Sequence, residues 1–372
     1  MKKAVFYCII DKMKYHIITF GCQMNVSDSE RIAGVLEGIN FKKTSNINEA
    51  NLIAVTMCSV RQSAVDRVHG LVQKFKKLNP KIKTILTGCI LEKDRKKFIN
   101  SFDYVIDIKD IKKLPEILKI SPTRQAQKLR DNVIFAHSNY LDITPKYSNE
   151  FSAAVPIMTG CNNFCSYCVV PYTRGREVSR QAKEIISEIK ILSKKNYKEI
   201  WLLGQNVNSY KDGKTNFPKL LKMANNIPGD FKLCFITSHP KDFSDELIKT
   251  MKNCKKLSKR LNLPIQSGDD EILKKMNRPY TVAQYKALVK KIRKAIPDIS
   301  LSTDIIVGFP GETKKQFQNT VKTLKEIGFD MAFVNKYSPR AGTAASKMKD
   351  NVPWAEKKRR EKILIELVNE PR

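Results

Sequence analysis

Apolar and polar residues alternate in regular blocks along the first 130 positions. Short apolar runs indicate strands, and longer stretches with helical periodicity between them indicate amphipathic helices. The predicted strands cover 14–20, 51–57, 81–87 and 103–106. One helix is predicted over 27–38, where Ser27 and Glu30 form a capping-box pattern, and another over 60–78. This order predicts a doubly wound parallel sheet.

The second half of the chain repeats the same alternation six times. Its predicted strands are 153–159, 198–203, 231–237, 259–265, 300–307 and 331–337. Its predicted helices are 181–195, 217–226, 244–253, 281–296, 313–327 and 354–369. Six units are too few to close an eight-stranded barrel, so we expect an open (βα)6 partial barrel with chemistry at the carboxyl ends of its strands. The predicted fold class is therefore α/β.

The chain divides where the periodicity stops. Residues 131–150 carry Asn, Ser, Pro and Tyr without a clear period, which predicts a linker between a domain at 14–130 and a domain at 151–372. Residues 1–13 read as an N-terminal extension. Their apolar stretch ends at Asp11 without a cleavage site, so a signal peptide is rejected, and no apolar run is long enough for a membrane span. We expect a cytoplasmic protein with reduced thiols.

Three cysteines stand close together just after the strand predicted at 153–159. They are Cys161, Cys165 and Cys168, in the spacing C-x3-C-x2-C. Structural zinc takes four protein ligands, and no fourth Cys or His follows nearby. Three thiolates at this spacing favour an iron–sulfur cube with one iron open to a small molecule.

Three further cysteines each end a predicted strand of the first domain. They are Cys22, Cys58 and Cys89. The carboxyl ends of parallel strands share one edge, so these thiols can converge despite their separation in sequence, and Gly21 and Gly88 allow a tight backbone there. A lone cysteine at a strand end is usually structural, but the repeated position predicts a second iron–sulfur cluster. The remaining cysteines, Cys8, Cys234 and Cys254, are interpreted as ordinary thiols.

The formal net charge of +31 points to an acidic partner, with nucleic acid as the first candidate. Lysine supplies most of the positive charge, and an A/T-rich genome produces the same bias. Charge alone therefore leaves both explanations open.

Residues 14 to about 362 resemble the methylthiotransferase family of radical S-adenosylmethionine (SAM) enzymes. The matching segments are F-G-C-Q-M-N at 20–25, C-V-V-P-Y-T-R-G at 168–175, L-G-Q-N-V-N at 203–208, T-D-I-I-V-G-F-P-G-E-T at 303–313 and Y-S-P-R-A-G-T at 337–343. The second and third segments are most similar to the branch that modifies isopentenyladenosine beside the tRNA anticodon. Sister branches modify threonylcarbamoyladenosine in tRNA or an aspartate of a ribosomal protein.

The resemblance implies two [4Fe-4S] clusters and SAM as cofactors. One SAM would methylate a sulfur at an auxiliary cluster held by Cys22, Cys58 and Cys89. A second SAM, at the cluster held by Cys161, Cys165 and Cys168, would be cleaved by an electron from a reducing donor. The resulting radical would start the replacement of a hydrogen on carbon 2 of the adenosine by a methylthio group. We expect a monomer and no acid–base residue in the chemistry.

Weaker assignments concern residues near the predicted strand ends. Candidates for contact with SAM or substrate are Gln205, Asn206, Gln266, Ser267 and Asp304. Candidates for contact with RNA phosphates are Arg174, Arg176, Lys357, Lys358, Arg359 and Arg360. Phe164 and Tyr167 could shield the cluster, and His239 could reach the site. For all of these, a structural role in capping, packing or ion pairing remains the alternative.

The sequence departs from the family pattern at its end. Members usually finish with a small basic β-barrel, the TRAM domain, whereas here the sequence ends at Arg372 after the last predicted helix, so we expect this domain to be absent. A function of another class also remains open, namely a non-catalytic iron–sulfur protein that binds RNA or senses redox state. Dependence on SAM separates the two.

Overall fold

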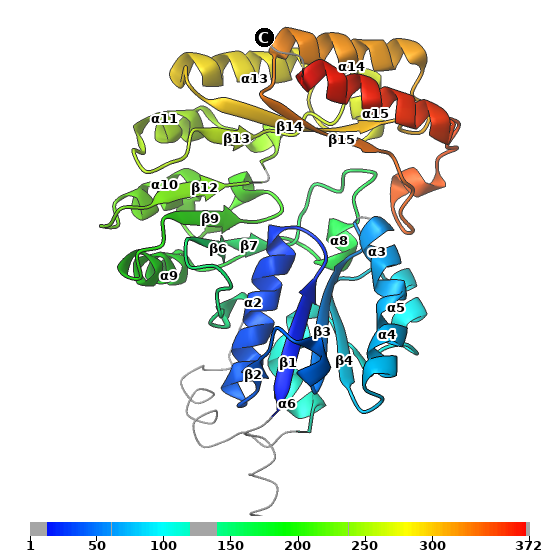
Figure 1. The fold of residues 1–372 in the computed structure, drawn as a ribbon. Coiled ribbons are helices and arrows are strands. Elements are labelled where there is room, and N and C mark those ends of the chain that lie inside the picture. The colour runs from blue at the N-terminus through cyan, green and yellow to red at the C-terminus, as the bar shows by residue number, and fades with distance from the viewer. Residues whose placement is uncertain (1–12, 61, 120–139, 237, 370–372) are drawn as a thin grey trace, which may run out of the picture. The chain divides into compact units, whose positions relative to one another are not determined.

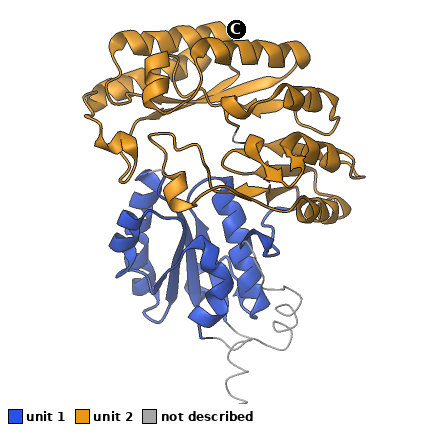
Figure 2. Ribbon diagram, turned by 180° about the vertical axis from the view of Figure 1, so that it is seen from behind, with its two compact units in different colours: residues 1–150 blue, residues 151–372 orange. Residues whose placement is uncertain are grey.

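The computed structural model describes residues 13–60, 62–119, 140–236 and 238–369. The chain divides into two compact units, residues 1–150 and residues 151–372 (Figure 2). The predicted extension, apart from Met13, lies outside the described residues, as does the first part of the predicted linker, 131–139. In the described part of the chain, no helix combines the length and apolarity needed to cross a membrane.

Unit 1 contains a five-stranded parallel sheet in the order β2-β1-β3-β4-β5 (Figure 1). Its strands are β1 (Lys14–Thr19), β2 (Lys42–Lys43), β3 (Leu52–Cys58), β4 (Lys83–Cys89) and β5 (Tyr104–Val105). Its helices are α2 (Gln23–Gly38), α3 (Gln62–His69), α4 (Leu71–Leu78), α5 (Glu92–Phe98) and α6 (Leu114–Ile117). Helix α2 covers one face of the sheet, and α3, α4 and α5 cover the other (Figure 1). The predicted doubly wound arrangement is therefore confirmed.

Helix α2 begins earlier than the sequence pattern predicted. Cys22 is its N-cap residue, and Asn25 takes the third helical position. Ser27 lies fully buried inside the helix, and its hydroxyl accepts a hydrogen bond from Arg31 at 2.6 Å. The carboxylate of Glu30 accepts from the backbone N–H of Ser148 at 2.9 Å. The capping box predicted for Ser27 and Glu30 is therefore wrong, because Ser27 bonds to Arg31 one turn later in the same helix and Glu30 bonds to Ser148 outside it.

Two other local predictions differ from the structure. The helix predicted over 60–78 is interrupted at Gly70, which separates α3 from α4, in keeping with the low helix propensity of glycine. The described end of the predicted linker, 140–150, lies within unit 1. There the hydroxyl of Tyr140 donates to Asp28 at 3.1 Å, and Leu141 accepts from the guanidinium of Arg31.

Unit 2 contains six main strands in two three-stranded parallel sheets, ordered β12-β9-β6 and β13-β14-β15. These strands are β6 (Ser152–Pro156), β9 (Glu199–Leu203), β12 (Lys232–Phe235), β13 (Arg260–Asn262), β14 (Ser300–Val307) and β15 (Met331–Lys336). Short pairs are formed by β7 (Met158–Thr159) with β8 (Val178–Ser179) and by β10 (Lys211–Asp212) with β11 (Thr215–Asn216). The helices are α8 (Val170–Thr173), α9 (Ala182–Lys194), α10 (Phe217–Asn225), α11 (Asp245–Asn253), α12 (Asp270–Lys275), α13 (Val282–Ala295), α14 (Lys314–Ile327) and α15 (Trp354–Asn369).

The two sheets of unit 2 form the predicted open arrangement of six βα units. Helices α13, α14 and α15 lie on one side of the β13–β14–β15 sheet (Figure 1). Strand β14 shows the consequence, because Leu301, Thr303, Ile305 and Val307 are buried whereas the alternate residues are only half-buried. The sheet therefore has one covered face and one more open face, on which Asp304 lies. The strand predicted over 153–159 is divided into β6 and β7.

Candidate metal centres

The three cysteines of unit 1 lie at one edge of its sheet. Cys58 and Cys89 are the last residues of β3 and β4 and are direct partners in the register of these strands. Strand β1 pairs with β3 up to Thr19, and Cys22 follows that strand at the start of α2. Cys58 and Cys89 are buried, whereas Cys22 is exposed. The topology thus places Cys58 beside Cys89 and puts Cys22 at the same end of the sheet, and their joint binding of a cluster stays a prediction.

Two glycines allow these strand ends to pack closely. Gly21 and Gly88 have φ angles of +151° and +112°. A Cβ atom on Gly21 would lie 2.4 Å from Oδ1 of Asn25 and 3.0 Å from Cβ of Cys58. One on Gly88 would lie 2.4 Å from the carbonyl oxygen of Met57. Any larger residue at either position would push the cysteine-bearing segments apart.

The side chain of Asn25 fills the space between these segments. It is fully buried, and its Nδ2 donates to the carbonyl oxygen of Met57 at 3.2 Å. Its Oδ1 accepts from the backbone N–H of Cys22 at 3.4 Å and from the Cys22 thiol at 3.5 Å. Asn25 therefore ties the segment after β1 to the end of β3. Sequence reasoning missed this residue, although an Asn three positions after a strand-end cysteine was a usable signal.

Ser59 joins the segments that follow Cys58 and Cys89. Its backbone N–H donates to the carbonyl oxygen of Cys89 at 2.8 Å, and its hydroxyl donates to Asp94 at 2.7 Å. The same hydroxyl accepts from the N–H of Leu91 at 3.1 Å. This buried network fixes the backbone on both sides of the two cysteines.

The cysteines of unit 2 lie on one loop between β7 and α8. Strands β7 and β8 pair in antiparallel fashion and close the base of this loop. Gly160, with φ +79°, precedes the first cysteine, and a Cβ atom there would lie 2.0 Å from the carbonyl oxygen of Arg176. The N–H of Cys161 donates to the carbonyl oxygen of Gly175 at 3.2 Å. The loop thus folds back tightly on its own continuation.

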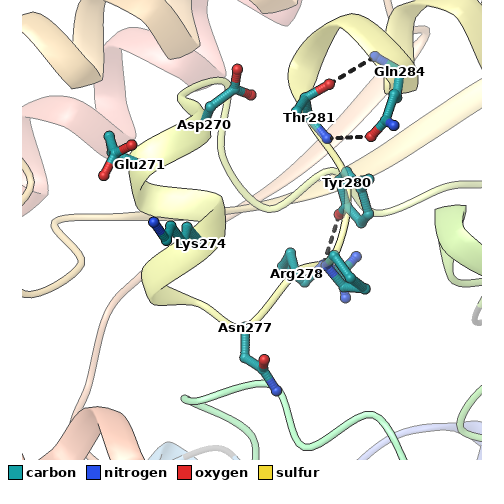
Figure 3. A pocket seen from close by; sticks show the side chains of 9 residues that line it. Asp270, Glu271, Lys274, Asn277, Arg278, Tyr280, Thr281 and Gln284 are labelled. Carbon is teal, nitrogen blue, oxygen red and sulfur yellow. Dashed lines mark hydrogen bonds between the residues drawn. The ribbon is translucent and has the colours of Figure 1, made fainter.

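The segment after α12 anchors this loop from outside. The hydroxyl of Ser166 donates to the carbonyl oxygen of Lys275 at 2.7 Å, and its N–H donates to that of Met276 at 3.0 Å. Asn277, with φ +56°, donates from Nδ2 to the carbonyl oxygen of Phe164 at 3.0 Å. Figure 3 shows Asn277 pointing away from the neighbouring helix toward that loop. The same segment lines a pocket of about 460 Å³ between α12 and α13.

Arg278 is the next residue of this segment and contacts a cysteine directly. Its Nη1 lies 3.5 Å from Sγ of Cys165, and its Nη2 donates to the carbonyl oxygen of Pro264 at 2.6 Å. Its Nε donates to the hydroxyl of Tyr280 at 2.7 Å (Figure 3). The side chain is 6 % exposed. Sequence reasoning missed Arg278, because it is more than a hundred positions away from the cysteine.

Two thiols of the unit 2 loop, Cys161 and Cys168, have raised pKa values. Burial, together with the neighbouring Cys165 and Cys161, raises the pKa of the Cys168 thiol to about 12. Burial likewise raises the pKa of Cys161. Iron ligands are thiolates, so loading a cluster onto this loop must release protons.

The donor sets fit clusters better than single ions. Within the described ranges, no three His, Cys, Asp or Glu side chains are gathered closely enough to hold one metal ion. A cubane distributes its cysteine ligands over different iron atoms, so three thiols need not meet at a point as they do around zinc. Both sets offer thiols only, on backbone that the adjoining glycines keep compact. These features fit a [4Fe-4S] cluster at each site.

Among the residues that the structure describes, several buried polar atoms after strands β9 and β12 have no protein partner. They are Oε1 of Gln205, Oδ1 of Asn206, both amide atoms of Asn208, Oγ of Ser238 and Nε2 of His239. Buried polar groups are normally hydrogen-bonded, so such a group of orphans marks a place for a polar ligand. The predicted residues Gln205, Asn206 and His239 are among them, and Asn208 and Ser238 were missed. SAM fits this edge, because it carries an amino-acid end and a nucleoside end.

His239 is held in its neutral form. Burial, together with the cations Arg278 and Lys241, lowers the pKa of its imidazole to about 2. Its Nδ1 accepts from the backbone N–H of Lys241 at 3.3 Å. The proton of the neutral ring therefore sits on Nε2, which offers one hydrogen bond to a ligand.

The other predicted contacts to SAM or substrate divide into two kinds. Gln266 has a φ of +71° and pairs through its backbone with Asp304 and Ile306 of β14, which leaves its side chain half-buried. Asp304 accepts from Nδ2 of Asn262 at 2.9 Å on the more open face of the sheet. Ser267 is fully buried, with its hydroxyl 3.5 Å from that of Thr320 on α14. The contact of Ser267 with a cofactor stays a prediction.

Three of the residues predicted to contact phosphates are buried. Lys357 and Arg360 are 3 % exposed, and they pair with Asp350 and Glu312 at 2.6 Å in each case. Arg174 is buried as well. Lys357 and Arg360 are thus engaged in buried ion pairs, and contact of these three residues with phosphate stays a prediction. Of the six predicted residues, Arg176, Lys358 and Arg359 are exposed.

The exposed arginines are partly engaged. Arg359 forms two hydrogen bonds with the carboxylate of Glu356, at 2.7 and 2.8 Å. Arg176 lies over the ring of Phe164, 4.3 Å from its centroid, and that ring also packs edge-on against Tyr172. Phe164 therefore packs beside the cysteine loop, and Tyr167 packs against the cluster of buried residues around Phe309 and Tyr337.

Comparison with known proteins gives matches over both units. A model of the Radical SAM superfamily matches residues 155–324, and a model of the uncharacterized protein family UPF0004 matches residues 14–108. A relative from Thermoanaerobacter sp. (strain X514) is 45 % identical over 367 residues, which cover 95 % of this chain and 78 % of the relative. One from Clostridium novyi (strain NT) is 45 % identical over 370 residues, covering 96 % and 81 %. Both are named tRNA-2-methylthio-N(6)-dimethylallyladenosine synthase.

Solved structures agree in fold at low sequence identity. The radical SAM methyltransferase TsrM from Kitasatospora setae, with cobalamin and a [4Fe-4S] cluster bound, aligns with a TM-score of 0.62 at 12 % identity over 90 % of this chain and 77 % of that one. The cobalamin-dependent radical SAM enzyme OxsB aligns with a TM-score of 0.58 at 10 % identity over 98 % and 56 %. The curated relatives carry the family assignment. The chain belongs to the methylthiotransferase family of radical SAM enzymes.

Proposed function

We propose that this protein is a tRNA methylthiotransferase that converts N(6)-dimethylallyladenosine beside the anticodon to its 2-methylthio derivative. The observation that carries the proposal is the presence of two thiol sites in one chain. A barrel that only cleaved SAM would need the loop cysteines, and the second set at the sheet edge of unit 1 supplies a place for sulfur chemistry. The names and high coverage of the curated relatives support the same activity.

In this proposal the cysteines have separate tasks. Cys161, Cys165 and Cys168 hold the cluster that, when bound, supplies the electron that cleaves SAM to a carbon radical. Cys22, Cys58 and Cys89 hold the auxiliary cluster beside which the sulfur is methylated. Gln205, Asn206 and His239 orient SAM or substrate through their unpaired polar atoms, and Asp304 and Gln266 line the adjoining edge.

RNA contact in the proposal rests on fewer residues than the charge pattern suggested. Three residues of the predicted set are exposed, and one of them, Arg359, is hydrogen-bonded to a carboxylate. Arg176 and Lys358 are the other two, and we assign the phosphate contacts to them. Phosphate contacts give an affinity that falls steeply with salt. Binding of isopentenylated tRNA should therefore weaken sharply between low and physiological ionic strength, and Arg176→Gln should reduce the slope of that dependence.

Three finer features complete the proposal. Reductive cleavage of SAM consumes one electron, which a separate reducing donor must provide. Thiol-held clusters persist in a reducing compartment, which favours the cytoplasm. We also infer a monomer, which sedimentation analysis of the reconstituted protein can test.

The decisive experiment is anaerobic reconstitution with iron and sulfide, followed by incubation with SAM, reductant and tRNA that carries isopentenyladenosine. Mass spectrometry of the digested nucleosides should show the 2-methylthio derivative. Formation of 2-methylthio-threonylcarbamoyladenosine instead would assign the chain to a sister branch. SAM cleavage without any methylthio product, on either tRNA or ribosomal protein, would refute the proposed transferase.

A further inference from the structure

We propose that Arg278 sets the reduction potential of the cluster held by Cys161, Cys165 and Cys168. This inference rests on the proposed function, because it requires a cluster at that loop. It gives a specific task to a residue outside the cysteine loop, namely to make the cluster easier to reduce.

The guanidinium of Arg278 is fixed against the loop. One nitrogen lies 3.5 Å from Sγ of Cys165, and the other two donate to the carbonyl oxygen of Pro264 and to the hydroxyl of Tyr280. That hydroxyl in turn donates to the carbonyl oxygen of Ile265 at 3.0 Å. The ring of Tyr280 also packs near the guanidinium, with its centroid 5.1 Å away. The charge cannot swing into solvent without breaking these contacts.

The charge of Arg278 lacks a carboxylate partner. Among the described residues, its hydrogen bonds go to a carbonyl oxygen, a hydroxyl and the cysteine sulfur. Two other buried arginines of unit 2 are paired with carboxylates, Arg180 with Glu188 and Arg360 with Glu312. A buried cation without an anion is costly. The anion that it fits is a thiolate of Cys165 bound to iron.

A buried cation at this position acts on the electron-accepting step. When an external one-electron donor is oxidised, the cluster takes up the electron and becomes more negative by one charge. A cation 3.5 Å from one ligand sulfur stabilises that reduced state more than the oxidised state, and hydrogen bonds to sulfur act in the same direction. The low-dielectric surroundings strengthen both effects.

The test uses a chain in which Cys22, Cys58 and Cys89 are replaced by Ala, so that one cluster remains. In this background, Arg278→Gln removes the charge and Arg278→Lys keeps it. Iron content is measured first, followed by a redox titration monitored by electron paramagnetic resonance. We expect Arg278→Gln to lower the ratio of reduced to oxidised cluster at a fixed potential at least tenfold, which is 59 mV for a one-electron couple. Arg278→Lys should stay within about threefold of the parent ratio.

Arg180→Gln is the matched control. Arg180 is also buried in unit 2, and it bonds the carbonyl oxygen of Pro156 and the carboxylate of Glu188 rather than a cysteine. It should leave the ratio unchanged. If Arg278→Gln binds a full complement of iron and keeps the parent ratio, the inference is overturned.

Loss of iron in the variants is also informative. If Arg278→Gln binds no iron, the Arg278→Lys variant decides. Full iron with a parent-like ratio of reduced to oxidised cluster supports the inference. Loss of iron, or a tenfold fall in that ratio, refutes it in favour of a structural role. Failure of the proposed function is recognised separately. If the loop cysteines do not hold a cluster, replacing Cys161, Cys165 and Cys168 in the same Cys22, Cys58 and Cys89 background would leave the iron and the resonance signal in place.

Discussion

The two cysteine sites are built on opposite principles. In unit 1, three strand ends each contribute one thiol, and the parallel register of β3 and β4 places Cys58 beside Cys89. In unit 2, a single loop contributes all three thiols, and residues from the segment after α12 hold that loop in shape. A site made by sheet topology needs small residues that let strands approach. A site made by a loop needs anchors from elsewhere in the fold.

The surroundings of the thiols differ in the same way. The neutral carboxamide of Asn25 lies beside Cys22, whereas the guanidinium of Arg278 lies beside Cys165. The polar groups around the unit 1 cysteines largely satisfy one another, through Asn25, Ser59 and Asp94. In the described part of unit 2, several buried polar atoms after β9 and β12 have no protein partner. In our proposal, these atoms bind an additional polar ligand, and Arg278 favours reduction of the cluster.

The largest effect on iron content and activity is expected from loss of the loop cysteines. Replacing Cys161, Cys165 and Cys168 together by Ala should reduce the iron of the reconstituted chain from about eight to about four atoms. It should also abolish both SAM cleavage and methylthio product, because the open iron is lost. Iron analysis and chromatography of 5′-deoxyadenosine measure these outcomes. Zinc in place of iron, or undiminished iron in the triple variant, would overturn the assignment.

Loss of one thiol from the sheet edge should have a narrower effect. Cys58→Ala should leave SAM cleavage intact but reduce methylthio product below detection, since the auxiliary cluster is no longer held. Cys234→Ala is a suitable control, because Cys234 is an equally buried thiol, located on β12. Both activities should survive in that control. Normal thiolation of tRNA by Cys58→Ala would contradict the separate roles of the two sites.

Much of this comparison was predictable from the sequence, and the reasons are local. Strand periodicity together with a cysteine at each strand end was enough to place Cys22, Cys58 and Cys89 at one edge. The contact between Arg278 and Cys165 spans 113 positions, and no local pattern announces it. Lys357 and Arg360 look like part of a basic surface run, but helical geometry turns them inward toward Asp350 and Glu312. The sequence therefore could not predict which single side chains make contacts with distant parts of the chain.

The next prediction concerns Asn25, which holds the edge of unit 1 together. Asn25→Ala would leave the carbonyl oxygen of Met57 and the N–H of Cys22 without their partner, and should lower the free energy of unfolding by about 2–3 kcal/mol. Asn25→Asp should be no better, since it places an oxygen against the Met57 carbonyl. Urea unfolding of the cluster-free chain measures the loss. Asn79→Ala, at the half-buried C-terminal end of α4, should cost much less.

A parent-like stability of Asn25→Ala would show that the strand ends hold together without this amide. The comparison of the two sites would then rest on the cysteines and glycines alone. Iron content of the same variant sharpens the test, because a loosened edge should lower occupancy of the auxiliary cluster while leaving SAM cleavage unchanged.

The smallest expected effect lies at the unsatisfied edge of unit 2 and depends on pH. Burial holds the pKa of His239 at about 2, whereas in the unfolded chain an imidazole titrates near 6.5. Below that value the unfolded state takes up a proton that the folded state does not, so stability falls as pH decreases from about 6.5 toward 2. At pH 5.5 the loss from this one group is about 1.4 kcal/mol.

His239→Asn removes the titration and keeps an acceptor for the N–H of Lys241. Urea unfolding of parent and variant at pH 7.5 and 5.5 gives a double difference in which other titrating groups cancel. The variant should lose less stability than the parent on acidification, and equal losses would mean that the imidazole is protonated in the folded chain and that its Nε2–H is not reserved for a ligand.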